Sequence, residues 1–155
     1  MTEDEERALV VAEAEKWIGT PYHTNGAVLG AGIDCGMLLV RAFVDTGIVK
    51  PFDPRPYPAQ WAFHQSAERY LTIVESLSRE FDDREPKPAD LVLFRFGKCW
   101  AHGGIIKEWP LMIHANPTVN PYAPCRIDDC ATNSDLGWRK KRFFSPWPRV
   151  WDGVS

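Results

Sequence analysis

Apolar residues recur at helical spacing in the first stretch of the chain. Thr2 and Glu5 have the three-residue spacing of a capping box, which predicts that a helix begins there. Gly19 supplies a C-terminal stop, and Pro21 follows shortly after it. The stripe predicted to face the core comprises Val10, Ala14, Trp17 and Ile18. The pattern therefore predicts a first helix that ends before Gly19.

Two further helical stretches follow, separated by segments rich in glycine or proline. Residues 20–33 have no periodicity and predict a loop, and a second helix is expected from about 34 to 46. A proline-rich linker is expected over 48–58, followed by a helical region over about 59–79, interrupted near Ser66. The inward residues of these helices are expected to be Leu38, Leu39, Ala42 and Phe43, then Trp61, Tyr70, Leu71, Val74 and Leu77.

The second half of the chain has the pattern of strands. Short apolar runs predict strands at 90–96, 103–109 and 111–114, with a turn at Trp109-Pro110, and a last strand at 139–144. Helices followed by a mostly antiparallel sheet are typical of the α+β class. We expect one domain over residues 1–155, because this length suits a single core.

Composition and charge restrict the classes of function. Apolar residues make up 45% of the chain and charged residues 25%, which is typical of soluble globular domains. The net charge of −3 argues against a nucleic-acid partner. The acidic N-terminus does not resemble a signal peptide, and no apolar run suits a membrane span, so cytoplasmic synthesis and no membrane association are expected.

One local concentration of charge stands out against this background. The basic run 139–142 is interpreted as the solvated face of an edge strand, with a weak anion or glycan contact as the alternative.

The histidines and cysteines do not have the spacing of a zinc site, so no metal and no cofactor are expected. Cys99, Cys125 and Cys130 are interpreted as reduced bystanders or packing residues. His23 and His64 are expected to be surface or helix-packing residues, with His64 lining a cleft as the alternative. Trp61, Trp100 and Trp109 are assigned to the core.

Cys35 carries the most informative chemistry. It follows a glycine-rich loop and opens the second predicted helix, where unpaired backbone N–H groups favour a thiolate and can bind an oxyanion. Asp34 is placed to cap this helix, and Gly36 leaves space for a substrate. From position alone, a catalytic thiol and a buried packing residue are equally good interpretations. His102 and His114, on neighbouring predicted strands, favour the first, because a thiol, a histidine base and a polar orienting residue perform acyl transfer.

Five short stretches in order extend this interpretation to a family. They are Trp17–Tyr22, Asp34–Gly36, Pro88–Phe94, His102–Ile105 and Ile113–Ala115. Together they resemble the NlpC/P60 peptidases, a papain-like group that cuts bacterial cell-wall peptides. The resemblance covers about residues 9–115.

The resemblance implies a role for each matching residue. Cys35 would be the nucleophile, His102 the base and His114 the third polar residue, with the Tyr22 hydroxyl near the thiolate or oxyanion. The implied substrate is the amide between γ-D-glutamate and a diamino acid in the peptidoglycan stem peptide. Gly36 stands where the family most often has serine, which removes only a side-chain hydrogen bond. The separation of Cys35 and His102 is long for the family, which implies a helical insertion over residues about 48–86. This insertion resembles the phage and gene-transfer-agent branch, which implies tail hub or tail-tip partners and a place in a virion tail.

Other functions remain open at this point. The same thiol site would serve an N-acetylmuramoyl-alanine amidase or an acyltransferase, because pocket shape selects the scissile bond. A structural tail protein with little activity is a further alternative.

Overall fold

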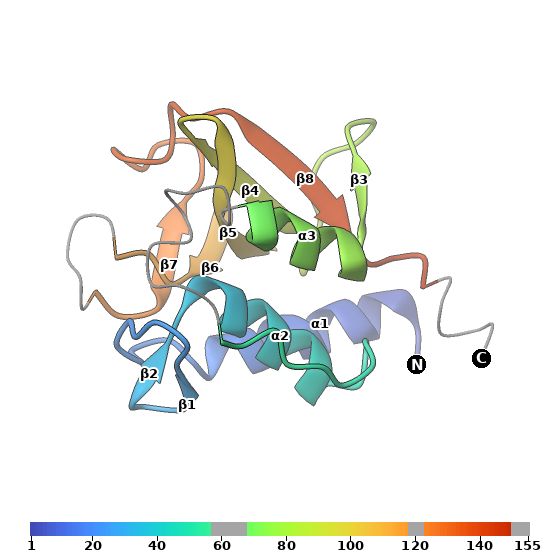
Figure 1. The fold of residues 1–155 in the computed structure, drawn as a ribbon. Helices are drawn as coiled ribbons and strands as arrows, with labels where there is room; N and C mark the ends of the chain where they lie inside the picture. Colours follow the sequence, from blue (N-terminus) through green and yellow to red (C-terminus); the bar gives the residue numbers. More distant parts are fainter. Residues whose placement is uncertain (57–67, 118–122, 150–155) are drawn as a thin grey trace.

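Three helices lie against one face of a six-stranded sheet in the computed structural model, which describes residues 1–56, 68–117 and 123–149 (Figure 1). The helices are α1 (Glu3–Glu15), α2 (Cys35–Asp45) and α3 (Glu68–Leu77). The strands are β1 (Ala27–Val28), β2 (Gly32–Ile33), β3 (Arg79–Phe81), β4 (Leu91–Phe96), β5 (Cys99–Glu108), β6 (Leu111–His114), β7 (Arg126–Asp129) and β8 (Lys141–Ser145). The α+β class predicted from the sequence is therefore confirmed.

The start of α1 follows the capping box. The backbone N–H of Glu5 donates to Thr2 Oγ1 at 3.1 Å, and the Glu5 carboxylate accepts from the Thr2 N–H at 3.3 Å. The helix ends at Glu15, earlier than predicted, and the chain continues as turns. Trp17 is buried as expected, whereas Ile18 is 41% exposed because the helical period no longer applies there.

The second helix begins where the sequence placed it. Asp34 is the N-cap, and its carboxylate accepts from the Met37 N–H at 2.8 Å. All four residues predicted to face inward are fully buried. Cys35 is consequently the first residue of a helix whose inner side is anchored in the core.

The insertion contains the third helix in its described part. Tyr70, Val74 and Leu77 are buried as predicted, and Leu71 is half-buried. Residues 57–67 lie outside the described part of the chain, so the predictions for Trp61, His64 and the break near Ser66 are not tested.

The sheet has the strand order β3-β8-β4-β5-β6-β7, with antiparallel pairing throughout. The four predicted strands are present, although β5 begins at Cys99, earlier than expected. Three features were not predicted: the β1–β2 hairpin inside the expected loop, β3, and β7. These strands have two to four residues each, which is too short to produce a readable alternation.

The basic run 139–142 reaches the start of a strand whose other end is not at an edge. β8 lies between β3 and β4, but β3 pairs with Phe143, Phe144 and Ser145, whereas Lys141 and Arg142 of the run pair with β4 alone. Arg142 forms an ion pair of 2.6 Å with Glu80 of β3, and the Arg139 guanidinium lies 3.7 Å from the centroid of the Phe96 ring. The run is solvated in part, but its arginines bind neighbouring strands.

The two faces of the sheet bury different clusters. Leu91, Leu93 and Ile105 pack with the helices, whereas Val92 and Phe94 face the other side with Ile106. This second cluster is closed by Cys130 and Leu136, from the segment after β7. Because strand residues alternate between faces, each residue of β5 is assigned to one side or the other.

A buried carboxylate joins α1 to the start of β4. Asp90 is fully buried and binds Arg7 of α1 at 2.8 Å and Arg84 at 2.7 Å, and it accepts from the Lys87 N–H at 2.8 Å. The guanidinium of Arg7 also donates to Pro88 O at 2.8 Å. Since both Arg7 and Asp90 are buried, each depends on the other for compensation of its charge.

Replacing Asp90 by alanine is expected to lower the free energy of unfolding by about 3 kcal/mol, because Arg7 would lose its buried anion and keep only the exposed Glu3. Chemical denaturation measures this change. Glu80→Gln is the matched control, since its ion pair with Arg142 is exposed and such pairs contribute under about 1 kcal/mol. Equal effects of the two substitutions would contradict the argument.

Candidate active site

Cys35 lies at the N-terminus of α2 with its side chain 4% exposed. Asp34 fixes this turn from both sides: one carboxylate oxygen accepts from Met37 of the helix, and the other accepts from the Asn25 N–H at 2.7 Å. The predicted capping role of Asp34 is therefore confirmed, and it also ties the helix start to the β1–β2 hairpin. Gly36 is buried next to Cys35 in the first turn.

The electrostatic environment of Cys35 differs from the sequence expectation. Burial and the neighbouring Asp34 carboxylate raise the pKa of the thiol well above its usual value. The backbone N–H groups of Gly36 and Cys35 and the hydroxyl of Tyr22 bind the sulfur and act in the opposite direction. The helix terminus thus stabilises a thiolate, as expected, but burial outweighs it, so the free protein holds a neutral thiol.

Tyr22 is placed beside this thiol, as the sequence interpretation required. Its hydroxyl hydrogen-bonds to Cys35, and burial raises its pKa well above the usual value. A phenol with a raised pKa remains an O–H donor throughout the physiological range. Tyr22 is therefore able to donate to a negative charge on sulfur or on an adjacent oxyanion.

His102 and His114 meet on the opposite face of β5 from the helices. Nε2 of His102 lies 2.9 Å from Nδ1 of His114, and Nε2 of His114 lies 2.7 Å from Oδ2 of Asp128. The proximity of the two histidines, inferred from a hairpin of uncertain register, is confirmed. Asp128 was not predicted: it lies on β7, a strand without apolar alternation, and nothing in the sequence connects it with His114.

The two imidazoles are neutral at rest. Burial lowers the pKa of His102 well below its usual value, and the neighbouring His114, Arg126 and Arg139 act in the same direction. Burial also lowers the pKa of His114, although the Asp128 carboxylate opposes it. Asp128 itself has a lowered pKa, because His114 and Arg126 both bind the carboxylate, so it is an anion.

The Cys35 thiol and the histidine relay, which comprises His102, His114 and Asp128, form two separate groups. Cys35 belongs to the core between the helices and the sheet, whereas the His102 ring stacks on Phe94 of the second cluster, with centroids 6.0 Å apart. Within the described residues, no hydrogen bond joins Cys35 to His102. The register of β4 and β5 shifts next to His102, between Phe94 and Arg95, which places His102 at an irregular point of the ladder.

Tyr70 of α3 lies between the two groups. Burial raises the pKa of its hydroxyl well above the usual value, and the nearby Cys35, Asp34 and Tyr22 act in the same direction. The same hydroxyl lies against Gly103, where a Cβ atom would be 2.7 Å from the Tyr70 oxygen. Gly103 thus leaves the space in which α3 reaches the strand beside His102. Sequence analysis identified Tyr70 only as a buried helix residue.

The remaining candidates lie apart from these groups. His23 is exposed, as expected, and Cys125 and Cys130 are buried. Cys99, Trp100 and Trp109 are half-buried rather than core residues. Across the described ranges, no group of three or more His, Cys, Asp or Glu side chains has the arrangement of a metal site. No described helix has the length and apolar character needed to cross a membrane.

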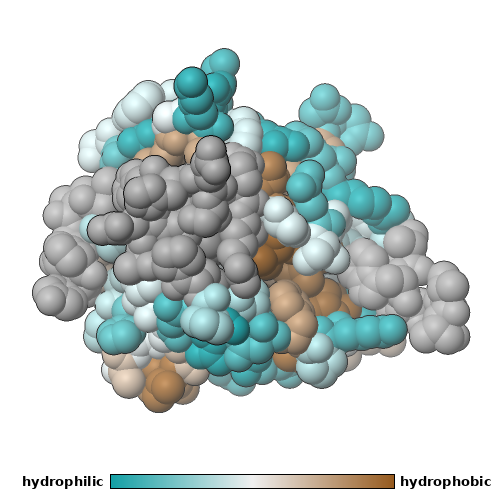
Figure 2. Space-filling model, in the orientation of Figure 1, coloured by the Kyte–Doolittle hydropathy of each residue, from teal (hydrophilic) through white to brown (hydrophobic). Residues whose placement is uncertain are grey.

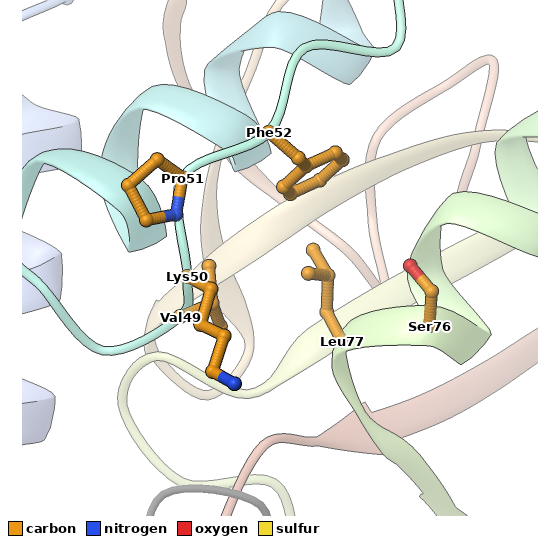
Figure 3. Close-up of a pocket in the computed structure, with 6 residues that line it drawn as sticks. All are labelled: Val49, Lys50, Pro51, Phe52, Ser76 and Leu77. Atoms are coloured by element: carbon orange, nitrogen blue, oxygen red, sulfur yellow. The ribbon is translucent and has the colours of Figure 1, made fainter.

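Two cavities of about 330 Å³ each open on the surface. One lies between the segment after α2 and the end of α3, and Figure 3 shows the apolar side chains of Pro51, Phe52 and Leu77 around it. It contains none of the predicted site residues; apolar surface lies around this region in Figure 2. The other is lined by residues 23–28, 31 and 32 and by Arg55, and it adjoins the turn that carries Tyr22.

Comparison with known proteins identifies the fold. The model of the NlpC/P60 family matches residues 19–141. The structure is similar to the NlpC/p60 domain of the peptidoglycan hydrolase SagA, with a TM-score of 0.62 and 20% identity over 90% of this chain and 97% of that one. It is also similar to the peptidoglycan hydrolase RipB of Mycobacterium tuberculosis, with a TM-score of 0.59 and 17% identity over 92% of this chain and 65% of RipB. No curated protein sequence matches the chain.

A third similar structure has a different function. RipD of Mycobacterium tuberculosis, described as a non-catalytic NlpC/p60 domain protein adapted to peptidoglycan binding, has a TM-score of 0.53 and 12% identity over 90% of this chain and 96% of that one. The family match covers most of the chain, and this protein therefore belongs to the NlpC/P60 family.

Because the pKa of Cys35 is raised, its alkylation by iodoacetamide is expected to accelerate about tenfold per pH unit from pH 7 to 9, following the thiolate fraction. Tyr22→Phe is expected to slow the reaction further, since the thiolate loses a donor. Peptide mass spectrometry separates Cys35 from the half-buried Cys99, which serves as the internal reference. A rate that is already constant below pH 8 would contradict a neutral resting thiol.

The buried relay also predicts a loss of stability in acid. Above pH 6.5 neither the folded nor the unfolded chain protonates His102 and His114, whereas below it the unfolded chain binds protons that the folded chain does not. The free energy of unfolding should then fall by up to about 1.4 kcal/mol per pH unit for each imidazole. Urea denaturation at pH 7 and 5 measures this slope, and His114→Asn should reduce it; an unchanged slope would contradict the assignment.

Proposed function

We propose that this protein is a cysteine peptidase that hydrolyses peptidoglycan stem peptides, at the amide between γ-D-glutamate and the diamino acid. The observation that carries the proposal is the presence of both a helix-terminal thiol, held by Tyr22, and the relay His102–His114–Asp128 in one NlpC/P60 fold. SagA and RipB, which share the fold, are described as peptidoglycan hydrolases. Activity on the same polymer is the simplest use of these residues.

The geometry suits general-base catalysis rather than a preformed ion pair. Both the thiol and the imidazole are neutral at rest, so proton transfer from Cys35 to His102 accompanies attack of sulfur on the amide carbonyl. The Cys35 N–H and the Tyr22 hydroxyl then donate to the oxyanion. The protonated His102 gives its proton to the leaving amine, and afterwards removes one from the water that hydrolyses the thioester.

This mechanism requires His102 and Cys35 to come together when substrate is bound. In free enzymes, catalytic hydrogen bonds are often long and shorten only in the substrate complex. Nδ1 of His102 makes none of the hydrogen bonds of the described residues, since the relay uses Nε2. It is therefore the ring atom that would accept the thiol proton. No cofactor takes part in this scheme.

A second candidate function is peptidoglycan binding without catalysis. The neutral, buried thiol and the lack of a hydrogen bond between Cys35 and His102 within the described residues favour it, and RipD gives a precedent in the same fold. The amidase and acyltransferase alternatives use the same residues and differ only in the bond attacked.

We also propose a phage-type tail setting, with tail hub or tail-tip partners. It is supported by the insertion at about 48–86, of which α3 is the described helix.

Cys35→Ala is expected to abolish hydrolysis of purified peptidoglycan, a loss of more than about 10³-fold, because it removes the proposed nucleophile. Mass spectrometry of the released fragments identifies the bond: free γ-D-glutamyl ends support the proposal, and release of intact stem peptides indicates an amidase. Cys99→Ala is the matched control and should retain activity. If the wild-type protein binds peptidoglycan but releases no fragment, the non-catalytic alternative is correct.

A further inference from the structure

We infer that Asp128 is a positioning residue that determines which ring nitrogen of His114 and of His102 carries the proton. The nitrogen of His102 without a proton, Nδ1, is then the one available to the thiol. The inference rests on the proposed thiol chemistry. It depends on three contacts: His102 Nε2 to His114 Nδ1 at 2.9 Å, His114 Nε2 to Asp128 Oδ2 at 2.7 Å, and Arg126 Nε to the same Oδ2 at 2.9 Å.

The carboxylate of Asp128 determines the tautomer of His114. An ionised carboxylate has acceptors and no donor, so the only hydrogen bond that His114 Nε2 makes with Asp128 is one in which Nε2 carries the proton. The opposite tautomer would place a ring lone pair against a carboxylate oxygen at 2.7 Å. Asp128 therefore holds neutral His114 as the Nε2–H tautomer.

The tautomer of His114 in turn determines that of His102, the proposed base. With its proton on Nε2, His114 has a lone pair at Nδ1, and the hydrogen bond of 2.9 Å then requires His102 to donate from its own Nε2. Neutral His102 consequently has its lone pair at Nδ1. Without Asp128, His114 would be free to donate from Nδ1; His102 would then carry its proton at Nδ1 and would be unable to accept one from a thiol.

Arg126 keeps the carboxylate of Asp128 ionised. It lies on the same strand as Asp128, and its cross-strand partner in the ladder is His114. Its guanidinium binds the oxygen that also accepts from His114, and it donates to Asn116 O and Pro124 O at 3.4 and 3.2 Å. The guanidinium is thus held by the backbone next to Asp128. An anion paired in this way stays ionised where a lone buried carboxyl would be protonated.

The first test needs no substitution. Nitrogen NMR of the ¹⁵N-histidine-labelled protein near pH 7 distinguishes the two tautomers of each ring. Both His102 and His114 should be Nε2–H. An Nδ1–H tautomer at either residue overturns the inference, whether or not the protein hydrolyses peptidoglycan.

The second test is the substitution Asp128→Ala. It should lower kcat on stem peptides by about 10- to 100-fold with little change in KM, because only the tautomer population changes. The NMR signals of His114 and His102 should shift toward Nδ1–H. Asp83→Ala, an exposed position in the loop before β4, is the control for loss of an acidic residue and should leave both measurements unchanged. Unchanged kcat and tautomers in Asp128→Ala would overturn the inference while leaving the peptidase proposal intact.

A double substitution separates positioning from a structural role. In His114→Asn, the amide oxygen accepts from His102 Nε2 directly, as the asparagine of papain-like sites does, and needs no carboxylate behind it. Asp128→Ala should then cost less than about twofold in the His114→Asn background. A further 10- to 100-fold loss there would show that Asp128 acts otherwise than through His114. If the wild-type protein shows no hydrolysis, the NMR measurements still decide the inference.

Discussion

The alternation of side chains along β5 is the constraint on which the arrangement depends. Residues on one face of this strand pack against all three helices, and residues on the other face carry the histidine relay. Gly103 and His102 are neighbours in sequence but belong to opposite faces. The strand therefore lies between the thiol, at the helix terminus, and the histidine relay.

The features of the chain that follow local rules could be predicted from its sequence. The capping box of α1, the Asp34 cap of α2 and the apolar runs of the central strands depend on neighbouring residues, so they are readable. The placement of β8 between β3 and β4 is different, because it pairs residues more than sixty positions apart. Its basic residues Lys141 and Arg142 pair with β4 alone, so the predicted edge applies to them and not to the apolar residues that follow.

The candidate site also contains some residues that local sequence reveals and others that only tertiary contacts bring in. Cys35, Tyr22 and Asp34 lie within one short stretch, and sequence motifs placed them correctly. Asp128 and Tyr70 reach the site through tertiary contacts of β7 and α3, which carry no motif. The charge state of Cys35 was also beyond prediction, because a helix terminus favours a thiolate while the depth of burial, which opposes it, is a property of the fold.

The central position of β8 has a consequence for the order in which this protein becomes complete during synthesis. Strands β3 and β4 emerge from the ribosome well before residues 141–145, yet neither has its full set of partners until that last strand is inserted between them. The N-terminal helices and the thiol are thus made early, while the sheet that holds the base stays open. The two halves of the candidate site are therefore assembled only after residues 141–145 have been inserted, although Cys35 is translated long before them.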